Sequence, residues 1–316
     1  MRKYVAAAVA ALGLAASAVS ASADDWAPPG PIKLMIAFAA GGGADTQARL
    51  VADALETRLG WQFIPEQVTG GGGVNLLRAM QDEPNDGTVI GMIVAESLGY
   101  NLFTADVGLS PADFTPLTTT AGAQMGIVSR SDTGWSSFED MIAAGQGGQE
   151  IRFGVMSPRL ADVAYLLGQA QGVDLNIITV RGGRAVLNGV TAGDMDVGFM
   201  AGIQGAGVAA GDLVNLASAM STPLVQTPDA PLIGDLGIEF SADAFFMFVA
   251  PGGMADAPRN ALSSAIAEVV SDPETEAGAL IQRAFGGPLL IQGADLEALV
   301  TQGFDESSVL LDAVSD

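Results

Sequence analysis

Residues 31–59 pass from an apolar run through three consecutive glycines into an amphipathic segment without interruption. Residues 32–38 are short, apolar and nearly unbroken, which is typical of a strand covered on both faces of a parallel sheet. The glycines at 41–43 allow a sharp turn, and Asp45 and Thr46 offer N-cap chemistry for a helix with apolar residues at helical spacing. The pattern predicts a strand, a tight loop and a helix, and so an α/β fold.

A second glycine loop at residues 70–73 follows the same plan. It lies between an apolar run at 61–67 and a segment of helical propensity at 74–80, and a third apolar strand at 88–94 comes after a turn. This order predicts a parallel sheet with right-handed crossovers. Both glycine loops would then lie beyond the carboxyl ends of neighbouring strands, where open α/β sheets bind ligands.

Glycines ahead of a helix leave its first N–H groups and its positive dipole end facing a cleft. Such a helix start suits an anion, above all a carboxylate or a phosphate. For one loop alone, a tight turn without a ligand is the alternative interpretation. Two converging helix N-termini favour the binding site.

The first residues predict a secretory signal peptide over 1–23. Arg2 and Lys3 precede an apolar run that is short for a membrane span, and the small residues Ala21 and Ala23 fit cleavage after Ala23. The chain contains no cysteine, which excludes disulfides, thiolate sites and a lipid-bearing N-terminal cysteine. We therefore expect a free periplasmic protein.

The charge balance argues against several partners. The chain has 36 acidic and 13 basic residues and a formal charge of −23, and removal of Arg2 and Lys3 would make it two units more negative. Such a surface repels nucleic acid and anionic membranes, so we expect neither as a partner. An anionic ligand would have to be held by backbone amides and a few arginines against this field.

Catalysis finds little support in the composition. The absence of histidine and cysteine excludes a Ser-His-Asp triad, a cysteine nucleophile and nearly every zinc site. The glycine loops lack the Lys-Ser/Thr pair of a P-loop, and the G-x-G-x-x-G dinucleotide fingerprint is absent. We expect no enzyme activity, no cofactor and no metal. An exported α/β enzyme is the rival from another class.

The chain without residues 1–23 is longer than one hydrophobic core usually serves, which suggests two lobes. We predict one lobe from residues 24–126 plus 246–316 and the other from 127–245. Residues 126–128 and 244–250 are the predicted crossing strands of a hinge. The helical patterns from residue 257 onward, ending with 294–311, should pack on the first lobe.

The motif FAAGGGAD at residues 38–45, with Ala48 and Arg49 after it, resembles the F-P-P-G-G-G-x-D-x-x-A-R opening of the tripartite tricarboxylate transporter receptors, also called Bug-type solute-binding proteins. Further similar segments follow in family order at residues 70–73, 86–87, 153–158, 181–183, 193–197 and 249–253. The resemblance covers essentially all of the chain after the signal peptide. The chain departs from the family's prolines at Ala39, Ala40 and Thr69, from its loop hydroxyl at Ala44, and from its G-G-N order at residues 73–75.

The resemblance implies a two-lobed, hinge-closing periplasmic binding protein of type II, with mixed or parallel sheets, helices on both faces and a ligand cleft between the lobes. As a monomer it would bind a small organic acid, either a di- or tricarboxylate or an aromatic carboxylate, and deliver it to the permease subunits of a membrane transporter. The alternative is a binding protein for an amino acid or another solute of a different transporter type. An amino acid would need an acidic partner for its amine, and Glu96 after the third strand is the candidate.

The glycine loops and the resemblance together predict the ligand-binding residues. The first lobe contributes two loops and a strand end: Ala40, Gly42, Gly43, Ala44, Asp45, Gly71, Gly72, Gly73, Val74, Asn75, Ala95 and Glu96. The second lobe contributes a helix start and a strand end, and the returning strand adds one aromatic residue: Ser157, Pro158, Arg159, Phe199, Met200, Ala201 and Phe245.

Some of these residues have a second interpretation. Arg159 is either a fork for a carboxylate or a solvated charge, because arginine is unfavourable in the first turn of a helix. Phe199, Met200 and Phe245 can equally be core residues. Arg181 and Arg184 are expected on the rim, in solvated structural roles.

Overall fold

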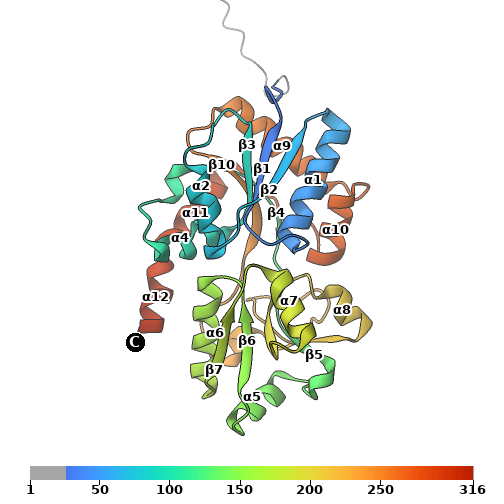
Figure 1. Ribbon diagram of the computed structural model, residues 1–316, viewed down its shortest axis with the longest axis vertical. Coiled ribbons are helices and arrows are strands. Elements are labelled where there is room, and N and C mark those ends of the chain that lie inside the picture. Colours follow the sequence, from blue (N-terminus) through green and yellow to red (C-terminus); the bar gives the residue numbers. More distant parts are fainter. Residues whose placement is uncertain (1–25, 316) are drawn as a thin grey trace, which may run out of the picture.

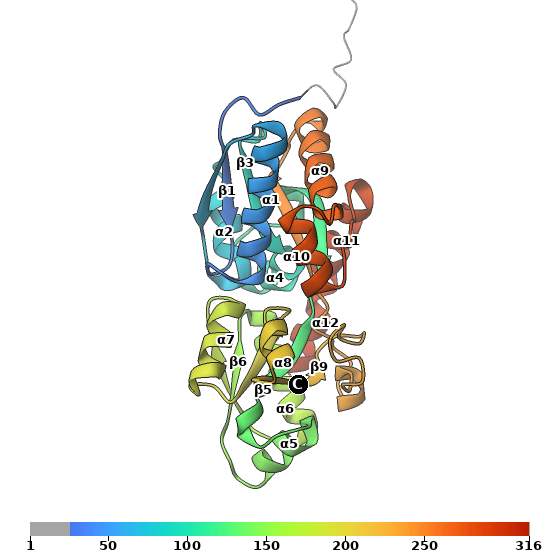
Figure 2. The same ribbon diagram turned by 90° about the vertical axis from the view of Figure 1, so that its right-hand side faces the viewer.

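The computed structural model describes residues 26–315, so the predicted signal peptide lies outside the described residues. Two α/β lobes lie one above the other along the longest axis of the molecule (Figure 1). Each lobe contains one five-stranded sheet with helices on both faces, and a view from the side shows the same division (Figure 2). The predicted fold class is confirmed.

The sheet of the first lobe has the order β2-β1-β3-β10-β4. Its strands are β1 (Ile32–Ile36), β2 (Phe63–Gln67), β3 (Val89–Val94), β4 (Phe114–Gly122) and β10 (Phe245–Pro251). Strand β1 pairs in parallel with β2 and β3, as predicted, and β10 runs antiparallel between β3 and β4.

Strand β4 is buried along nearly its whole length, although its sequence pattern did not reveal it. Pro116 and four threonines interrupt the apolar pattern that marks a buried strand. The threonine hydroxyls are satisfied inside the protein: Thr120 donates to Gln47 Oε1 at 2.7 Å and Thr118 donates to the carbonyl of Thr119 at 3.0 Å. Hydrogen bonding therefore lets a polar sequence occupy a core strand.

The sheet of the second lobe repeats this arrangement in the order β7-β6-β8-β5-β9. Its strands are β5 (Met125–Arg130), β6 (Ile151–Val155), β7 (Leu175–Thr179), β8 (Val197–Ala201) and β9 (Leu213–Ser218). Strand β6 is parallel to β7 and β8, and β5 is antiparallel to β8 and β9. In both sheets the antiparallel fourth strand is the one that the chain forms just after it crosses from the other lobe.

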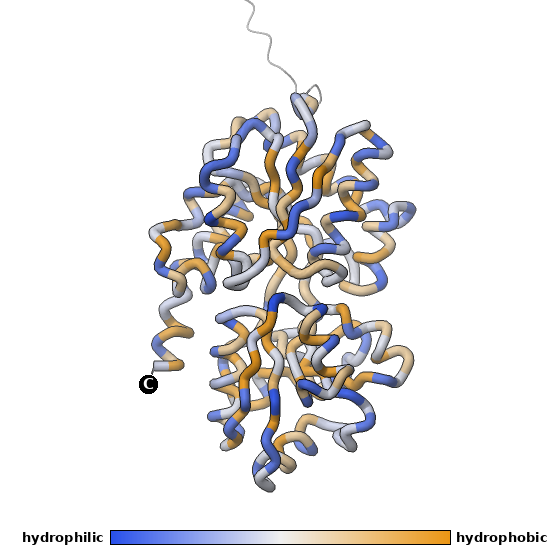
Figure 3. The backbone as a smooth tube through the Cα atoms, in the orientation of Figure 1, coloured by the Kyte–Doolittle hydropathy of each residue, from blue (hydrophilic) through white to orange (hydrophobic). Residues whose placement is uncertain are grey.

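Helices cover both sheets, and apolar residues concentrate along the strands between them (Figure 3). The first lobe has α1 (Gly43–Leu59), α2 (Val74–Met80), α3 (Ala95–Leu98), α4 (Tyr100–Ala105), α9 (Asp256–Ser271), α10 (Glu276–Phe285) and α11 (Gly293–Asp305). The second has α5 (Phe138–Gln146), α6 (Pro158–Gln171), α7 (Gly183–Ala192) and α8 (Gly205–Ala210). Short 3-10 turns occur at Gly71–Gly73, Pro111–Asp113, Ser131–Thr133 and Ile233–Leu236. None of these helices has the length and apolar character needed to cross a membrane, within residues 26–315.

The last helix, α12 (Ser307–Ser315), corrects the prediction that all C-terminal helices pack on the first lobe. Helices α9, α10 and α11 do contribute to the first core, but α12 lies beside α6 (Figure 1), and Leu310 is buried in the second core. After α11 the chain leads into α12, which packs against α6 of the second lobe and α4 of the first. The lobes are thus joined by three crossings of the chain.

Candidate functional site

A cavity lies between the lobes, where the carboxyl ends of β1 and β3 face those of β6 and β8. Glycine, alanine and larger apolar residues form nearly all of its wall. Its lining comprises Phe38, Gly42, Gly43, Ala44, Val94, Glu96, Ala123, Met125, Met156, Leu160, Gly183, Ala201, Ile203, Ala244 and Phe246. Of the predicted site residues, Gly42, Gly43, Ala44, Glu96 and Ala201 are brought together here.

Helix α1 starts at this cavity without a side-chain cap. Its N-cap is Gly42, and the N–H groups of Gly43 and Ala44 find no acceptor among residues 26–315. The sequence suggested Asp45 as an N-cap, but the N-cap is Gly42. Asp45 is buried in the first turn, where its carboxylate accepts hydrogen bonds from the Gly41 N–H and from Arg49 Nε, both at 2.8 Å. Asp45 shapes the loop and leaves the first amides of α1 free.

Helix α7 of the second lobe starts on the opposite side of the same cavity. Its N-cap is Gly182, at φ 98°, again without a side-chain cap. The two helix starts are close: a Cβ atom on Gly42 would lie 4.0 Å from the Arg184 backbone nitrogen, and one on Gly182 would lie 3.2 Å from the Ala39 nitrogen. Arg184 Nε also donates to the Gly41 carbonyl at 3.0 Å. The N-termini of two helices from different lobes therefore meet at the cleft.

The sequence interpretation missed α7 as part of the site and placed Arg184 on the rim. Arg184 is exposed, as expected, but it contacts the first glycine loop directly. The signal was present in the glycine pair 182–183 ahead of a helix, which repeats on a smaller scale the pattern at residues 41–43. Only the approach of the lobes shows that the two helix starts share one cavity.

The second glycine loop lies beside the central cavity and is held by side chains of its own lobe. All four of its glycines have positive φ, between 60° and 117°. The Gly72 carbonyl accepts hydrogen bonds from Ser97 Oγ at 2.7 Å and from Asn101 Nδ2 at 3.2 Å. A second hollow lies next to this loop and shares Phe38 and Met156 with the central cavity. Five of the predicted site residues line it, together with Arg181: Gly71, Gly72, Asn75, Ser157 and Pro158.

The first backbone N–H groups of helix α6 already donate hydrogen bonds to protein side chains. Pro158 has no N–H, the Arg159 N–H donates to Asn101 Oδ1 at 3.2 Å, and the Leu160 N–H donates to Ser157 Oγ at 3.3 Å. Asn101 belongs to α4 of the first lobe, so one side chain joins the second glycine loop to the start of α6. The sequence interpretation did not single out Asn101, because its partners lie 29 and 58 residues away along the chain.

Glu96 and Arg159 face each other across the lobes. Arg159 Nη2 donates to the Ser241 carbonyl at 2.6 Å, and its Nη1 lies 3.8 Å from Glu96 Oε2. Glu96 is 8% exposed, and its other oxygen, Oε1, lies 3.5 Å from Asn101 Nδ2. Arg159 is thus engaged with Glu96 and a carbonyl, while Glu96 itself lines the central cavity.

The remaining predicted residues lie outside the linings of these two hollows. Phe199 and Met200 are fully buried core residues, and Phe199 packs edge-on against Phe153 with ring centroids 4.9 Å apart. Strand alternation and sheet packing direct both side chains into the core, which agrees with the second interpretation that the sequence allowed for these two residues. Phe245 packs at the border of the first core, and the next residue, Phe246, lines the cavity instead. Of the others, Ala40 is exposed, Ala95 is half-buried, and Gly73 and Val74 are buried.

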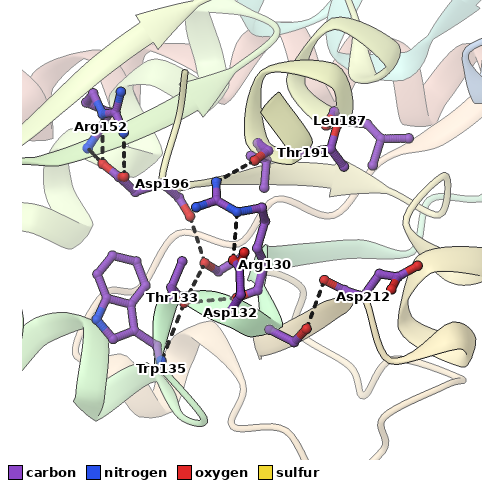
Figure 4. Close-up of polar contacts among 12 residues, drawn as sticks. Arg130, Asp132, Thr133, Trp135, Arg152, Leu187, Thr191, Asp196 and Asp212 are labelled. Atoms are coloured by element: carbon purple, nitrogen blue, oxygen red, sulfur yellow. Dashed lines mark hydrogen bonds and ion pairs between the residues drawn. The ribbon is translucent and has the colours of Figure 1, made fainter. Parts of the chain in front are cut away.

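A charged cluster of the second lobe lies at the end of β5 and the start of β6, and Figure 4 shows its polar contacts. Arg152 holds Asp196 with two guanidinium hydrogen bonds, at 3.0 and 2.6 Å, and Arg130 contacts Asp132 Oδ1 and the Val190 carbonyl, both at 2.8 Å. Burial disfavours the charged Asp196, but the bonds from Arg152 outweigh it and lower the pKa of this carboxyl. These groups satisfy one another, so the cluster is structural. Within residues 26–315 no group of acidic side chains is arranged to hold a metal ion.

Residues 47–285 match the protein family described as the tripartite tricarboxylate transporter family receptor. The chain is 30% identical, over 80% of its length and 78% of the relative's, to the UPF0065 protein in the gbd 5' region of Cupriavidus necator. Its fold is similar to that of the periplasmic binding protein BugD, with a TM-score of 0.79 and 20% identity over 92% of this chain and 99% of BugD. It is also similar to Rpa4515 of R. palustris, whose structure was solved with adipate, with a TM-score of 0.79 and 19% identity over 92% and 99% of the two chains.

Proposed function

This chain belongs to the tripartite tricarboxylate transporter receptor family, whose members are periplasmic solute-binding proteins, and we propose that it captures a small organic carboxylate in the cleft between its lobes. The ligand is then delivered to the permease subunits of a membrane transporter. We further propose that residues 1–23 direct export and are removed after Ala23, that the mature protein acts as a monomer, and that it catalyses no reaction.

The observation that carries the proposal is the meeting of α1 and α7 at one cavity. Each helix N-terminus is equivalent to roughly half a positive charge, and each is capped by a glycine that leaves its first N–H groups for a ligand. A carboxylate has several acceptor positions and can take hydrogen bonds from both helices at once. Two helix ends give a local positive potential inside a chain whose formal charge is −23. Adipate in a protein of the same fold supports this ligand class.

The same geometry links binding to closure. The donors of α1 belong to the first lobe and those of α7 to the second, so a carboxylate that touches both binds the closed arrangement better than an open one. The ligand therefore shifts the population toward closure, and the crossings between the lobes absorb the motion. Closure also removes water, which strengthens each charge-assisted contact. The closed form is what a permease would recognise.

Thermal unfolding of the chain from residue 24 onward tests the ligand class. At least one small carboxylate should raise the melting temperature, since a ligand at 100 times its Kd stabilises the native state by about 2.7 kcal/mol. The methyl esters of the same acids are the matched controls, because they keep the shape and lose the charge. A nucleotide that shifts the melting temperature where no acid does would contradict the proposal, as would esters that act as well as the acids.

A pair of substitutions at Gly43 tests the helix donors directly. Gly43 is the first residue of α1, where proline is tolerated, and Gly42 before it is extended at φ −79° and ψ 172°, as a residue before proline should be. Gly43→Pro removes one N–H, whereas Gly43→Ala adds a Cβ and keeps it. By calorimetry, the proline variant should bind the acid about 1.5–3 kcal/mol more weakly than the alanine variant, as expected for a lost charge-assisted hydrogen bond. Equal affinities would show that this amide does not contact the ligand.

A further inference from the structure

We infer that the ligand has a single carboxylate and, at its other end, a hydrogen-bond donor that Glu96 accepts, an inference that rests on the proposed function. Glu96 would then be a specificity-determining residue that selects donor-bearing monocarboxylates and rejects di- and tricarboxylates. The donor can be an ammonium, an amide N–H or a hydroxyl, which share this chemistry.

The first observation is an unused oxygen. Glu96 is 8% exposed and lines the central cavity, yet its Oε2 has no hydrogen-bond partner among residues 26–315. Its ion-pair partner, Arg159 Nη1, is 3.8 Å away, too far for a hydrogen bond, and Nη1 likewise makes no hydrogen bond within residues 26–315. A buried carboxylate oxygen that no donor meets is costly, and such oxygens are rare in folded proteins. A donor on the ligand would satisfy it.

The second observation is the position of Glu96 relative to the start of α1. Strands β1 and β3 are parallel neighbours with Ile36 opposite Met92, and neighbouring strands lie about 4.8 Å apart. The loop after β1 leads to Gly43, and the end of β3 leads within four residues of Met92 to Glu96. Both therefore line one cavity from adjacent strand ends. A small molecule can place its carboxylate at α1 and its opposite end at Glu96.

The wall between these two positions is apolar. Phe38, Met156, Leu160, Ile203 and Phe246 contribute the larger side chains of the lining. An aliphatic or aromatic body would fill this part of the cavity without leaving unpaired polar groups. The lining thus fits a ligand with a polar group at each end and an apolar middle.

The third observation is the sign of the charge. Glu96 is the only charged side chain among the cavity-lining residues of the described range 26–315. A second carboxylate on the ligand would meet the Glu96 carboxylate in a water-poor site, and like charges placed together there are strongly unfavourable. Arg159 supplies a counter-charge from the second lobe but makes no hydrogen bond to Oε2 within residues 26–315. The cavity therefore accepts one carboxylate and excludes another.

Ligands with one five-carbon skeleton test this inference by calorimetry on the protein from residue 24 onward. The series is 5-aminopentanoate, 5-hydroxypentanoate, the monoamide of pentanedioate, pentanedioate itself and pentanoate. At least one of the three donor-bearing acids should bind about tenfold or more tightly than pentanedioate, a ratio equivalent to ~1.4 kcal/mol. The strongest of the three identifies the donor. Pentanedioate binding as tightly as all three would overturn the inference.

The variant Glu96→Gln sharpens the result, because an amide can donate to a carboxylate and cannot repel it. The preference for the donor-bearing acid over pentanedioate should fall by about tenfold, while binding of pentanoate, which reaches Glu96 with a methyl group, should change less than about threefold. An unchanged preference would overturn the inference. The wild-type series decides the question alone if the variant does not fold. Binding of acids without any preference overturns only this inference, whereas the absence of binding by every acid, pentanoate included, overturns the proposed function as well.

Discussion

The two glycine loops of the first lobe have nearly the same sequence pattern and opposite surroundings. In the loop at residues 41–43 only Gly41 has a positive φ, at 74°, and the loop ends at free helix amides beside the central cavity. In the loop at residues 70–73 all four glycines have positive φ, and the carbonyl of Gly72 is bound by two buried side chains. A run of glycines therefore shows that side chains are excluded, and only the packing shows what excludes them.

In the second loop the excluding groups are protein atoms. A Cβ on Gly72 would come within 2.7 Å of Asn101 Cγ and 3.0 Å of Ser157 Cβ in the other lobe. In the first loop the nearest atom to a Cβ on Gly42 is the Ala39 carbonyl oxygen, at 3.2 Å. Both loops contact the other lobe, but only the first ends at free helix amides, so the first is the better candidate for direct contact with a ligand.

The largest expected effect is a loss of stability on substitution in the second loop. Gly72→Ala places a side chain at φ 61° and against the buried Asn101, which should lower the free energy of unfolding by about 3 kcal/mol or more. Gly42→Ala, at φ −79°, should cost about 1 kcal/mol or less. Urea unfolding of both variants measures the difference. Equal losses would mean that the two loops are under the same constraint after all.

A smaller effect is expected at the side chain that holds the second loop. Ser97→Ala removes the 2.7 Å hydrogen bond to the Gly72 carbonyl but leaves that of Asn101, so the loss of stability should be about 1–2 kcal/mol. Thr46→Ala in the first turn of α1 is the matched control and should change stability by less than about 0.5 kcal/mol. Equal melting temperatures of the two variants would mean that Ser97 does not hold the loop.

The smallest effect is expected for the arginine at the first loop. Arg184 is exposed and donates to the Gly41 carbonyl, so Arg184→Ala should weaken ligand binding by about 0.5–1 kcal/mol through the loop. Arg181→Ala removes the same charge from an exposed arginine whose side chain makes no hydrogen bond within residues 26–315, and should weaken binding less. Calorimetry with one acid compares the two. Identical losses would assign the effect to charge alone and not to the loop.

The sequence was sufficient to predict the strands and helices whose apolar residues recur with a regular period. The parallel set β1, β2 and β3 and the helix at Pro158–Gln171 with its Ser157 N-cap follow their predictions closely. Strand β4 was not predicted, because the hydrogen-bond partners of its threonine hydroxyls cannot be read from the periodicity of the sequence. Local pattern identifies an element well when burial alone determines it, and poorly when distant hydrogen bonds do.

The candidate site was predicted in part for the same reason. Gly42, Gly43 and Glu96 follow strand ends, and strand ends can be recognised in a sequence. The role of α7 and the engagement of Arg159 depend on how far apart the lobes are, which no local pattern encodes. Asn101 is the clearest case, since it contacts the Gly72 carbonyl and the Arg159 N–H, which lie 29 and 58 residues away along the chain.

The C-terminal helix has a mechanical consequence. Two crossings between lobes define an axis of rotation, but α12 adds a third connection, because it lies beside α6 (Figure 1) and Leu310 is buried in the second core. On the same side, Tyr100 of α4 donates to Asp162 of α6 at 2.6 Å, and burial together with this bond raises the pKa of the tyrosine. Helix α12 contacts α4 of the first lobe as well as α6 of the second, so we expect a rotation of the lobes to disturb one of these two contacts. We therefore expect residues that line neither hollow to limit how far the lobes open.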